Sequence, residues 1–162
     1  MQQQKKQLLV ETYTLDCSSG VCQDLLTESE KKLVNAGALF FITKLQESDR
    51  VNGNNRVYPH STLKREVDKY MAGPIKNGNS YGCLDHDDDE IIKLSEVCLI
   101  MRDLWWTNDK ELWGKLQVTS TPKGDIVKGL HKDGGLLSIS SRSLGSLTES
   151  KGKRIVNEDL DL

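Results

Sequence analysis

The chain has 162 residues, a net charge of −2, and a composition that is 36% hydrophobic and 28% charged. This combination is typical of one globular domain with its own core, and it argues against a disordered protein. The near-neutral charge and the lack of a basic stripe argue against a nucleic-acid-binding protein. No apolar run reaches the ~18 residues of a membrane span. The polar N-terminus does not resemble a secretion signal, so we expect a cytosolic setting.

The N-terminal part of the chain predicts two strands separated by a weaker helical segment. Residues 8–15 roughly alternate between apolar and polar side chains, which is typical of a half-buried strand. Residues 24–34 have helical content but a poor amphipathic pattern, so residues 1–35 are the least well defined part of the domain. Residues 38–45 are rich in aromatic and β-branched side chains and predict a strong strand.

A loop, a helix and a short strand are expected next. The Asn-Gly and Asn-Asn steps within residues 49–59 predict an ordered loop. Ser61 fits the N-cap of a helix whose apolar residues recur at helical spacing, and we expect that helix to end at Gly73-Pro74. Residues 80–84 predict a short strand that leads to His86.

The second half of the chain predicts a long antiparallel hairpin and then a helix. Residues 94–106 and 111–119 form the two strands of that hairpin, with residues 107–110 as its tip. A proline at the first position is typical of a helix start, and it occurs here at Thr121-Pro122.

Two further strands complete the expected architecture. Ile126, Val127 and Leu130 give the last helix an apolar side, and residues 136–143 and 154–160 predict strands. Strands outnumber helices, so the fold class is α+β: a mainly antiparallel β-barrel or sheet flanked by helices, in a single domain over residues 1–162.

A histidine and a group of serines are the candidate catalytic residues. His86 follows a strand end within a polar turn, where a scaffold can hold the ring while the loop exposes it to substrate. Ser138 and Ser140 share one face of their predicted strand, because side chains alternate across a strand. If that strand lies beside the one ending at His86, the imidazole could activate either hydroxyl. A surface histidine and a polar strand face fit the same residues.

Metal binding is a competing interpretation of the same histidine. Cys83 and His86 have a Cys-x-x-His spacing that Cys17 and Cys22 could complete as a zinc site. His86 with the acidic cluster 87–89 could instead hold Mg²⁺ or Mn²⁺ in a metal-dependent hydrolase. A solvated acidic turn explains this cluster equally well.

Three stretches together resemble the prohead (capsid maturation) proteases of tailed phages, especially those of the myophage type. They are Val-Asn-Gly-Asn-Asn-Arg-Val-Tyr-Pro at 51–59, Gly-Cys-Leu-Asp-His at 82–86, and Ile-Ser-Ser-Arg-Ser-Leu-Gly-Ser-Leu at 139–147 with Arg-Ile-Val-Asn after it. The third stretch is similar to the block that contains the family's nucleophile, and its first serine matches Ser140. In this family Gly tends to occupy the position of Ser143, which is a departure.

The resemblance implies a herpesvirus-protease-like fold and a serine endopeptidase without a cofactor. It implies that the enzyme acts inside the prohead, in the host cytoplasm, on scaffold and core proteins, on the major capsid protein and on itself. Myophage members tend to cut after Glu in Leu/Ile-x-Glu, which occurs here at 26–28 and 147–149. The resemblance is also compatible with a homo-oligomer. Relatives carry more sequence than a chain ending at Leu162, which is compatible with a shortened or processed form.

The resemblance also suggests roles for particular side chains. His86 is the expected general base and Ser140 the expected nucleophile, with Ser141 and Arg142 supporting the oxyanion. Asp103 is the first candidate for the residue that orients His86, and Glu96 remains open. A noncatalytic capsid-assembly or scaffold protein on the same fold is the alternative function.

Overall fold

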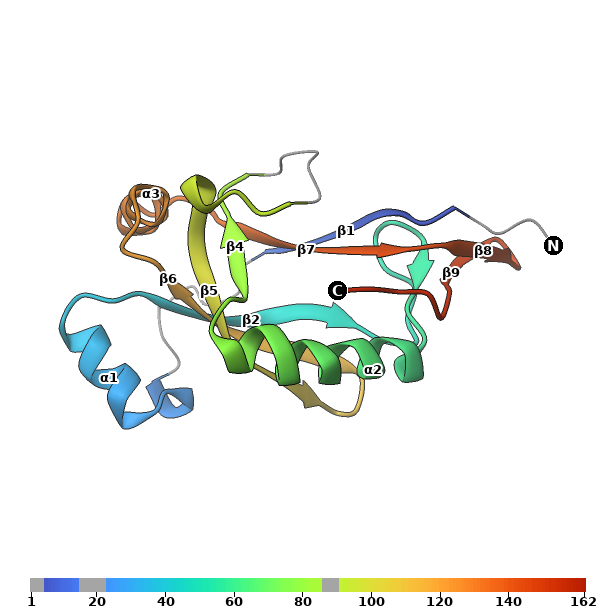
Figure 1. Cartoon of the computed structure of the whole chain (residues 1–162), viewed down its shortest axis with the longest axis horizontal. Helices are drawn as coiled ribbons and strands as arrows, with labels where there is room; N and C mark the ends of the chain where they lie inside the picture. Colours follow the sequence, from blue (N-terminus) through green and yellow to red (C-terminus); the bar gives the residue numbers. More distant parts are fainter. Residues whose placement is uncertain (1–4, 15–22, 86–90) are drawn as a thin grey trace.

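The computed structural model describes residues 5–14, 23–85 and 91–162, and within them the strands form three sheets (Figure 1). The largest sheet is antiparallel, with strand order β2-β6-β5-β4. Its strands are β2 (Phe40–Glu47), β6 (Glu111–Val118), β5 (Val97–Thr107) and β4 (Tyr81–Cys83). At the β5–β6 tip, Asn108 and Asp109 both have φ of 52°, as a tight hairpin turn requires.

The other two sheets are smaller. β1 (Gln7–Thr14) and β7 (Ser138–Gly145) form an antiparallel two-stranded sheet. The third sheet combines β3 (Arg56–Val57), β9 (Lys153–Val156) and β8 (Leu147–Ser150). β3 pairs with β9 in parallel, and β8 pairs with β9 as a hairpin. Figure 1 shows β1 and β7 side by side along the length of the molecule, with β8 and β9 at one end.

Helices surround the sheets. They are η1 (Gln23–Leu25), α1 (Glu28–Asn35), α2 (His60–Tyr70) with its continuation η2 (Met71–Ile75), η3 (Leu94–Glu96) and α3 (Pro122–Lys132). α1 begins with a capping box in which Thr27 and Glu30 satisfy each other's backbone N–H groups. In the described part of the chain, no helix is long and apolar enough to cross a bilayer.

One hydrophobic core joins the large sheet, α2 and the β1/β7 sheet. Leu9 of β1, Leu63 and Val67 of α2, and Leu116 of β6 are all almost completely buried in it. Lys115 points to the opposite face of the large sheet, where its Nζ donates to Leu25 O and Glu30 Oε2 at α1. The β1/β7 sheet therefore packs against the face of the large sheet that points away from α1.

The expected α+β class, with antiparallel sheets flanked by helices, is confirmed, while several local predictions are corrected. The helix expected to end at Gly73-Pro74 continues through a wide π-helical turn, which tolerates a proline that lacks an N–H donor. β8 was not expected as a separate strand. Ile126 and Leu130 are 46% and 47% exposed, so only Val127 of the expected apolar side is buried.

Candidate active site

Ser140 lies in β7 directly opposite Thr12 of β1. The hydroxyl oxygens Ser140 Oγ and Thr12 Oγ1 are 2.8 Å apart, which is a hydrogen bond between two side chains far apart in sequence. Ser140 is half-buried, whereas Ser138, two residues earlier on the same face, is exposed. The structure therefore distinguishes the two serines that strand alternation alone left equivalent.

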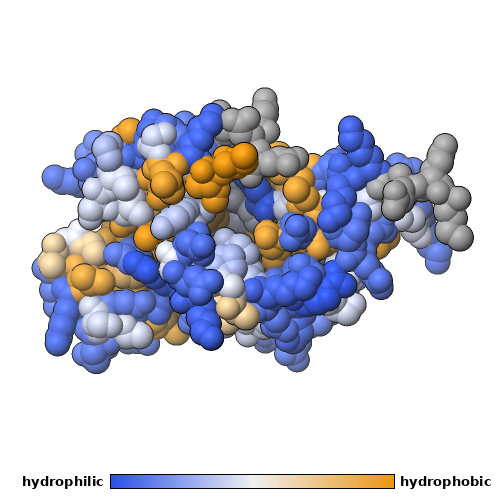
Figure 2. Space-filling model, in the orientation of Figure 1, coloured by the Kyte–Doolittle hydropathy of each residue, from blue (hydrophilic) through white to orange (hydrophobic). Residues whose placement is uncertain are grey.

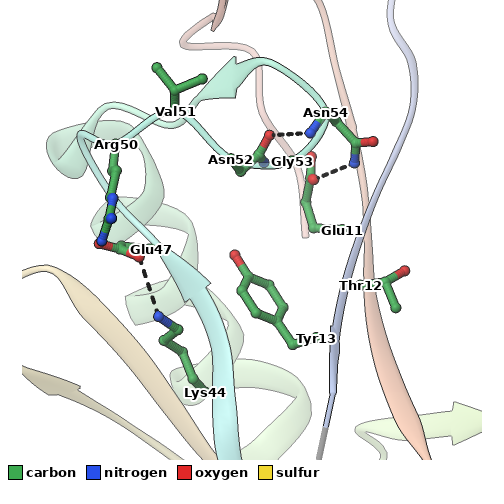
Figure 3. A pocket seen from close by; sticks show the side chains of 10 residues that line it. All are labelled: Glu11, Thr12, Tyr13, Lys44, Glu47, Arg50, Val51, Asn52, Gly53 and Asn54. Carbon is green, nitrogen blue, oxygen red and sulfur yellow. Dashed lines mark hydrogen bonds and ion pairs between the residues drawn. The ribbon is translucent and has the colours of Figure 1, made fainter.

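The two faces of the β1/β7 sheet have different chemistry. Figure 3 shows Thr12 and Tyr13 pointing to opposite sides of β1. Because Thr12 pairs with Ser140 and Glu11 pairs with Ser141, the Ser141 side chain lies on the Glu11 side, away from Ser140. We call the side with Ser140 the outer face and the side with Glu11 the inner face.

A pocket of about 230 Å³ connects the outer face to the end of β4. Arg142, which shares the outer face with Ser140, lines it together with Cys83, Leu84 and Asp85. The pocket thus places Arg142, two residues from Ser140 along β7, beside the residues that immediately precede His86. Its remaining lining residues are Ile91, Ile92, Lys93 and Glu96.

The chain turns sharply where β4 leads toward His86. Asp85 has φ of 61°, a left-handed conformation that is uncommon for a residue with a side chain and is often found near functional sites. His86 and the acidic cluster 87–89 lie outside the described residues, as do Cys17 and Cys22. Both metal hypotheses depend on these residues, so the described geometry does not test them. Among the described residues, no group of three or more His, Cys, Asp or Glu could hold a metal.

Apolar side chains are exposed beside this pocket. Ile91 is 80% exposed and Leu94 is 72% exposed, on the segment that leads into β5. Figure 2 shows apolar surface gathered in this part of the molecule. An aliphatic substrate side chain would find a complementary surface there.

The backbone direction of β7 bears on oxyanion binding. Leu144 exchanges two backbone hydrogen bonds with Asp161 on the side away from β1. In an antiparallel ladder, alternate residues point their N–H groups the same way, so those of Ser140 and Arg142 also point away from β1. The N–H group of Ser141 instead points toward β1.

The two candidate carboxylates lie far apart, with Glu96 at the end of η3 and Asp103 within β5. Val97 pairs with Cys83, at the end of β4 nearest His86. Asp103 is six residues further along the strand, roughly 20 Å away at 3.3 Å per residue. It lies opposite Lys115, and its Oδ1 accepts from Leu104 N–H at 2.9 Å. The described geometry does not bring Asp103 to the pocket, whereas Glu96 lines it and forms an ion pair with Lys123 at 2.9 Å.

The Asn-rich loop at 49–59 clamps the inner face of β1. Glu11 has a side chain that is only 3% exposed, and it accepts from Asn54 Nδ2 at 2.7 Å (Figure 3). It also accepts from Arg56 Nη1 at 2.9 Å and Tyr58 Oη at 2.8 Å. Burial, followed by the negative charge of Glu11, raises the pKa of Tyr58, so its hydroxyl stays a donor. Asn52 braces the loop by accepting from two backbone N–H groups, as expected for a structural residue.

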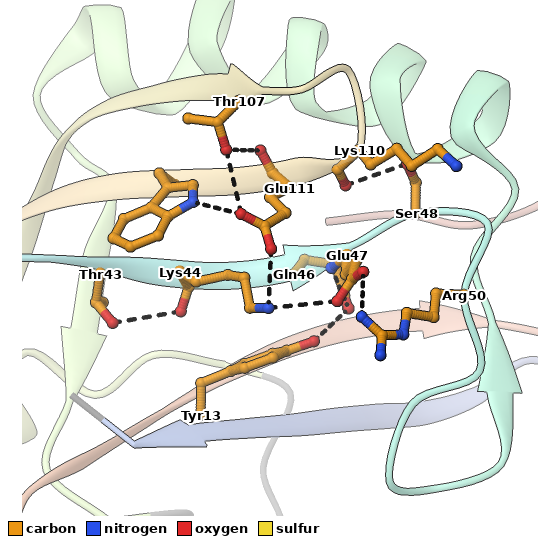
Figure 4. Close-up of polar contacts among 11 residues, drawn as sticks. Tyr13, Thr43, Lys44, Gln46, Glu47, Ser48, Arg50, Thr107, Lys110 and Glu111 are labelled. Carbon is orange, nitrogen blue, oxygen red and sulfur yellow. Dashed lines mark hydrogen bonds and ion pairs between the residues drawn. The ribbon is translucent and has the colours of Figure 1, made fainter. Parts of the chain in front are cut away.

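A larger pocket of about 540 Å³ lies on the inner side of β1, between that strand and the end of β2. Lys44 Nζ is 3.3 Å from both Glu47 and Glu111, and Arg50 Nη1 is 3.1 Å from Glu47 (Figure 4). Tyr13 Oη donates to Gln46, and burial raises the pKa of Tyr13 to about 12. This pocket has its charges paired within its own wall, and it lies on the face away from Ser140.

The sequence did not single out Thr12 or Glu11. A signal for Glu11 was present, because it is in phase with Leu9 and Tyr13 on the apolar side of an alternating strand. A carboxylate at such a position needs buried partners. Thr12 carried no signal, because its role depends on the partner strand.

A family of proteins described as prohead core protein serine proteases matches residues 11–162. The chain belongs to this family. It is a phage prohead protease, and hence a peptidase and a hydrolase, which confirms the resemblance drawn from the sequence. Membership places the protein in the prohead during capsid assembly.

Two comparisons, one of sequence and one of structure, agree with this assignment. The chain is 29% identical over 161 residues to the prohead core protein protease of Enterobacteria phage T4, covering 96% of this chain and 75% of the relative. The solved structure of the bacteriophage T4 capsid assembly protease superposes with a TM-score of 0.81 at 28% identity, covering 98% of this chain and 94% of that one.

Proposed function

We propose that this prohead protease is a serine endopeptidase in which Ser140 is the nucleophile and His86 the general base. The observation that carries the proposal is the pocket shared by Arg142 and the residues that precede His86. Ser140 is on the same face of β7 as Arg142, and Asp85, which lines the pocket with Arg142, immediately precedes His86 in the sequence.

In the proposed reaction, His86 takes the proton of Ser140 Oγ as that oxygen bonds to the scissile carbonyl carbon. The carbonyl π electrons move to its oxygen, and the oxyanion accepts hydrogen bonds from backbone N–H groups of β7, with Arg142 adding positive charge. His86 then gives the proton to the leaving amine, and the C–N bond breaks. The backbone N–H groups of Ser140 and Arg142, which point away from β1, support this arrangement. Ser141, whose N–H points toward β1, remains a weaker prediction as an oxyanion residue.

The proposed substrates are scaffold and core proteins, the major capsid protein and the protease itself, cut after Glu in Leu/Ile-x-Glu. Leu84, Ile91 and Ile92 in the pocket would suit the aliphatic side chain of such a sequence. The relatives that prompt this proposal are named as prohead and capsid assembly proteases of phage T4.

Replacing the nucleophile tests the mechanism most directly. Ser140→Ala is expected to lower cleavage of a fluorogenic peptide containing Leu-Thr-Glu by a factor of about 10³ or more, with an unchanged melting temperature. Ser138→Ala is the matched control on the same face of the strand, and it is expected to retain most activity. Full activity in Ser140→Ala would refute the assignment and point to one of the other serines.

The residue that orients His86 is proposed to be Glu96, with Asp103 as the competing prediction. Glu96 lines the pocket, whereas Asp103 lies further along β5. We expect Glu96→Gln to lower kcat by a factor of about 10² to 10⁴, as expected when a carboxylate no longer holds a catalytic histidine. Asp103→Asn is the matched comparison, and a larger loss there than in Glu96→Gln would reverse the assignment.

A further inference from the structure

We propose that Thr12 is a positioning residue for the nucleophile: its hydroxyl holds Ser140 Oγ in place for attack. This inference rests on the proposed function, because it takes Ser140 as the nucleophile. The observation is the 2.8 Å hydrogen bond between Thr12 Oγ1 and Ser140 Oγ, which joins two strands that are 128 residues apart in sequence.

The pairing geometry of the two strands brings these short side chains together. Val10 O accepts from Asn54 Nδ2 and Arg56 Nη1, so its carbonyl points away from β7. Residues in phase with Val10, including Thr12, therefore form the pairs without direct backbone hydrogen bonds. In such pairs the Cα atoms are only about 4.5 Å apart, which lets two hydroxyls meet.

The inner face of β1 fixes Thr12 in position. The neighbouring Glu11 is held by side chains from three residues of the Asn-rich loop, and two of those donors also reach Val10 O. A threonine on an otherwise free edge strand would move with that strand. Here the clamp on one face of β1 restrains the hydroxyl on the other.

The chemistry requires Thr12 to donate to Ser140 during attack. Ser140 Oγ has one proton and two acceptor lone pairs. When Thr12 donates to one lone pair, the Ser140 proton is left for His86, and the second lone pair is left for the carbonyl carbon. Thr12 keeps its own proton throughout, so it lowers the number of accessible Ser140 rotamers without entering the bond changes.

Three variants test this role in the full chain. Thr12→Val removes the hydroxyl with nearly the same shape, and it is expected to lower kcat for the Leu-Thr-Glu peptide about tenfold with KM unchanged. Thr12→Ser keeps the hydroxyl and is expected to restore most of kcat. Thr14→Val is the matched control, because Thr14 lies two residues along the same face, opposite Ser138, and is expected to behave as wild type.

Labelling by a fluorophosphonate gives a second measurement that does not depend on peptide binding. Thr12→Val is expected to react more slowly at saturating probe, with the half-saturating concentration and melting temperature matching those of Thr14→Val. Equal rates for Thr12→Val and Thr14→Val, or a Thr12→Ser variant as slow as Thr12→Val, would overturn the proposal. A fully active Ser140→Ala would instead overturn the assigned nucleophile, so the two failures are distinguishable.

Discussion

Two buried ion pairs in this molecule are nearly equal in geometry but differ in their surroundings. Arg56 and Glu11 are 2.9 Å apart with side chains 14% and 3% exposed. Lys115 and Glu30 are 2.8 Å apart with side chains 7% and 15% exposed. The first ties the Asn-rich loop to β1, and the second ties α1 to the large sheet. Similar electrostatic contacts therefore support two different parts of the fold.

The two ion pairs differ in their distance from Ser140. Glu11 neighbours Thr12, which contacts Ser140, so a disturbance of this pair reaches the proposed nucleophile within two residues. Lys115 faces α1 on the opposite side of the large sheet. Buried pairs are costly to break one partner at a time wherever they lie. Only the Glu11 pair should also affect catalysis, so the two pairs separate stability from function.

The largest effect is expected for Glu11→Ala. This change leaves Arg56 buried without its carboxylate and removes the acceptor for Tyr58, so the free energy of unfolding should fall by about 3–5 kcal/mol in urea titrations. Activity should also fall by about 100-fold at a temperature where the variant is fully folded, because β1 is no longer fixed.

The double variant Glu11→Ala/Arg56→Met tests whether this loss of stability comes from the unpaired charge of Arg56. If the cost comes from an uncompensated charge, the double variant should be more stable than the sum of the two single changes predicts. A loss below about 1 kcal/mol in Glu11→Ala would contradict the clamp.

A smaller effect is expected for Lys115→Met, with a loss of about 2–3 kcal/mol at neutral pH and unchanged activity per folded molecule. Burial tends to raise the pKa of Glu30, but hydrogen bonds from Lys115 and Thr27 outweigh it and hold the pKa below its ordinary value of 4.5. A lowered carboxyl pKa stabilises the fold above the unfolded-state value and ceases to do so as pH falls through the folded-state value.

The difference in stability between wild type and Lys115→Met should therefore be widest near pH 7 and narrow below about pH 4.5. Melting temperatures across this range measure it. A gap that stays constant with pH would show that the lysine contributes through packing of its stem. A specific loss of activity in Lys115→Met would contradict the expectation that only the Glu11 pair affects catalysis.

The sequence correctly predicted those strands and helices that are recognisable from the pattern of neighbouring residues. The strand at 38–45, the long hairpin after residue 94 and the proline-started helix at residue 122 all correspond to observed elements. Alternation placed Ser138 and Ser140 on one face. The opposing strand was needed to show that Ser140 contacts Thr12, because cross-strand register is not written in either strand alone.

The part of the site that sequence reasoning missed depends on contacts between distant segments. Residues 49–59 were expected to form an ordered loop, but nothing in their sequence indicated that Arg56 and Tyr58 reach across to Glu11. Asp103 was the first candidate for orienting His86, and antiparallel pairing places the opposite end of β5, at Val97, beside Cys83 at the end of β4. Position along a strand says little until the direction of its neighbour is known.

The β8–β9 hairpin has a consequence for the lifetime of the enzyme. Its Leu147-Thr148-Glu149 segment pairs residue by residue with Val156, Ile155 and Arg154. Val156 is almost fully buried, and β9 is also held by β3. Proteases cut extended, accessible chain, so if this protease cleaves itself here, the hairpin must first open. The rate of that opening would then limit the rate of self-cleavage, so that other substrates in the prohead could be cut first.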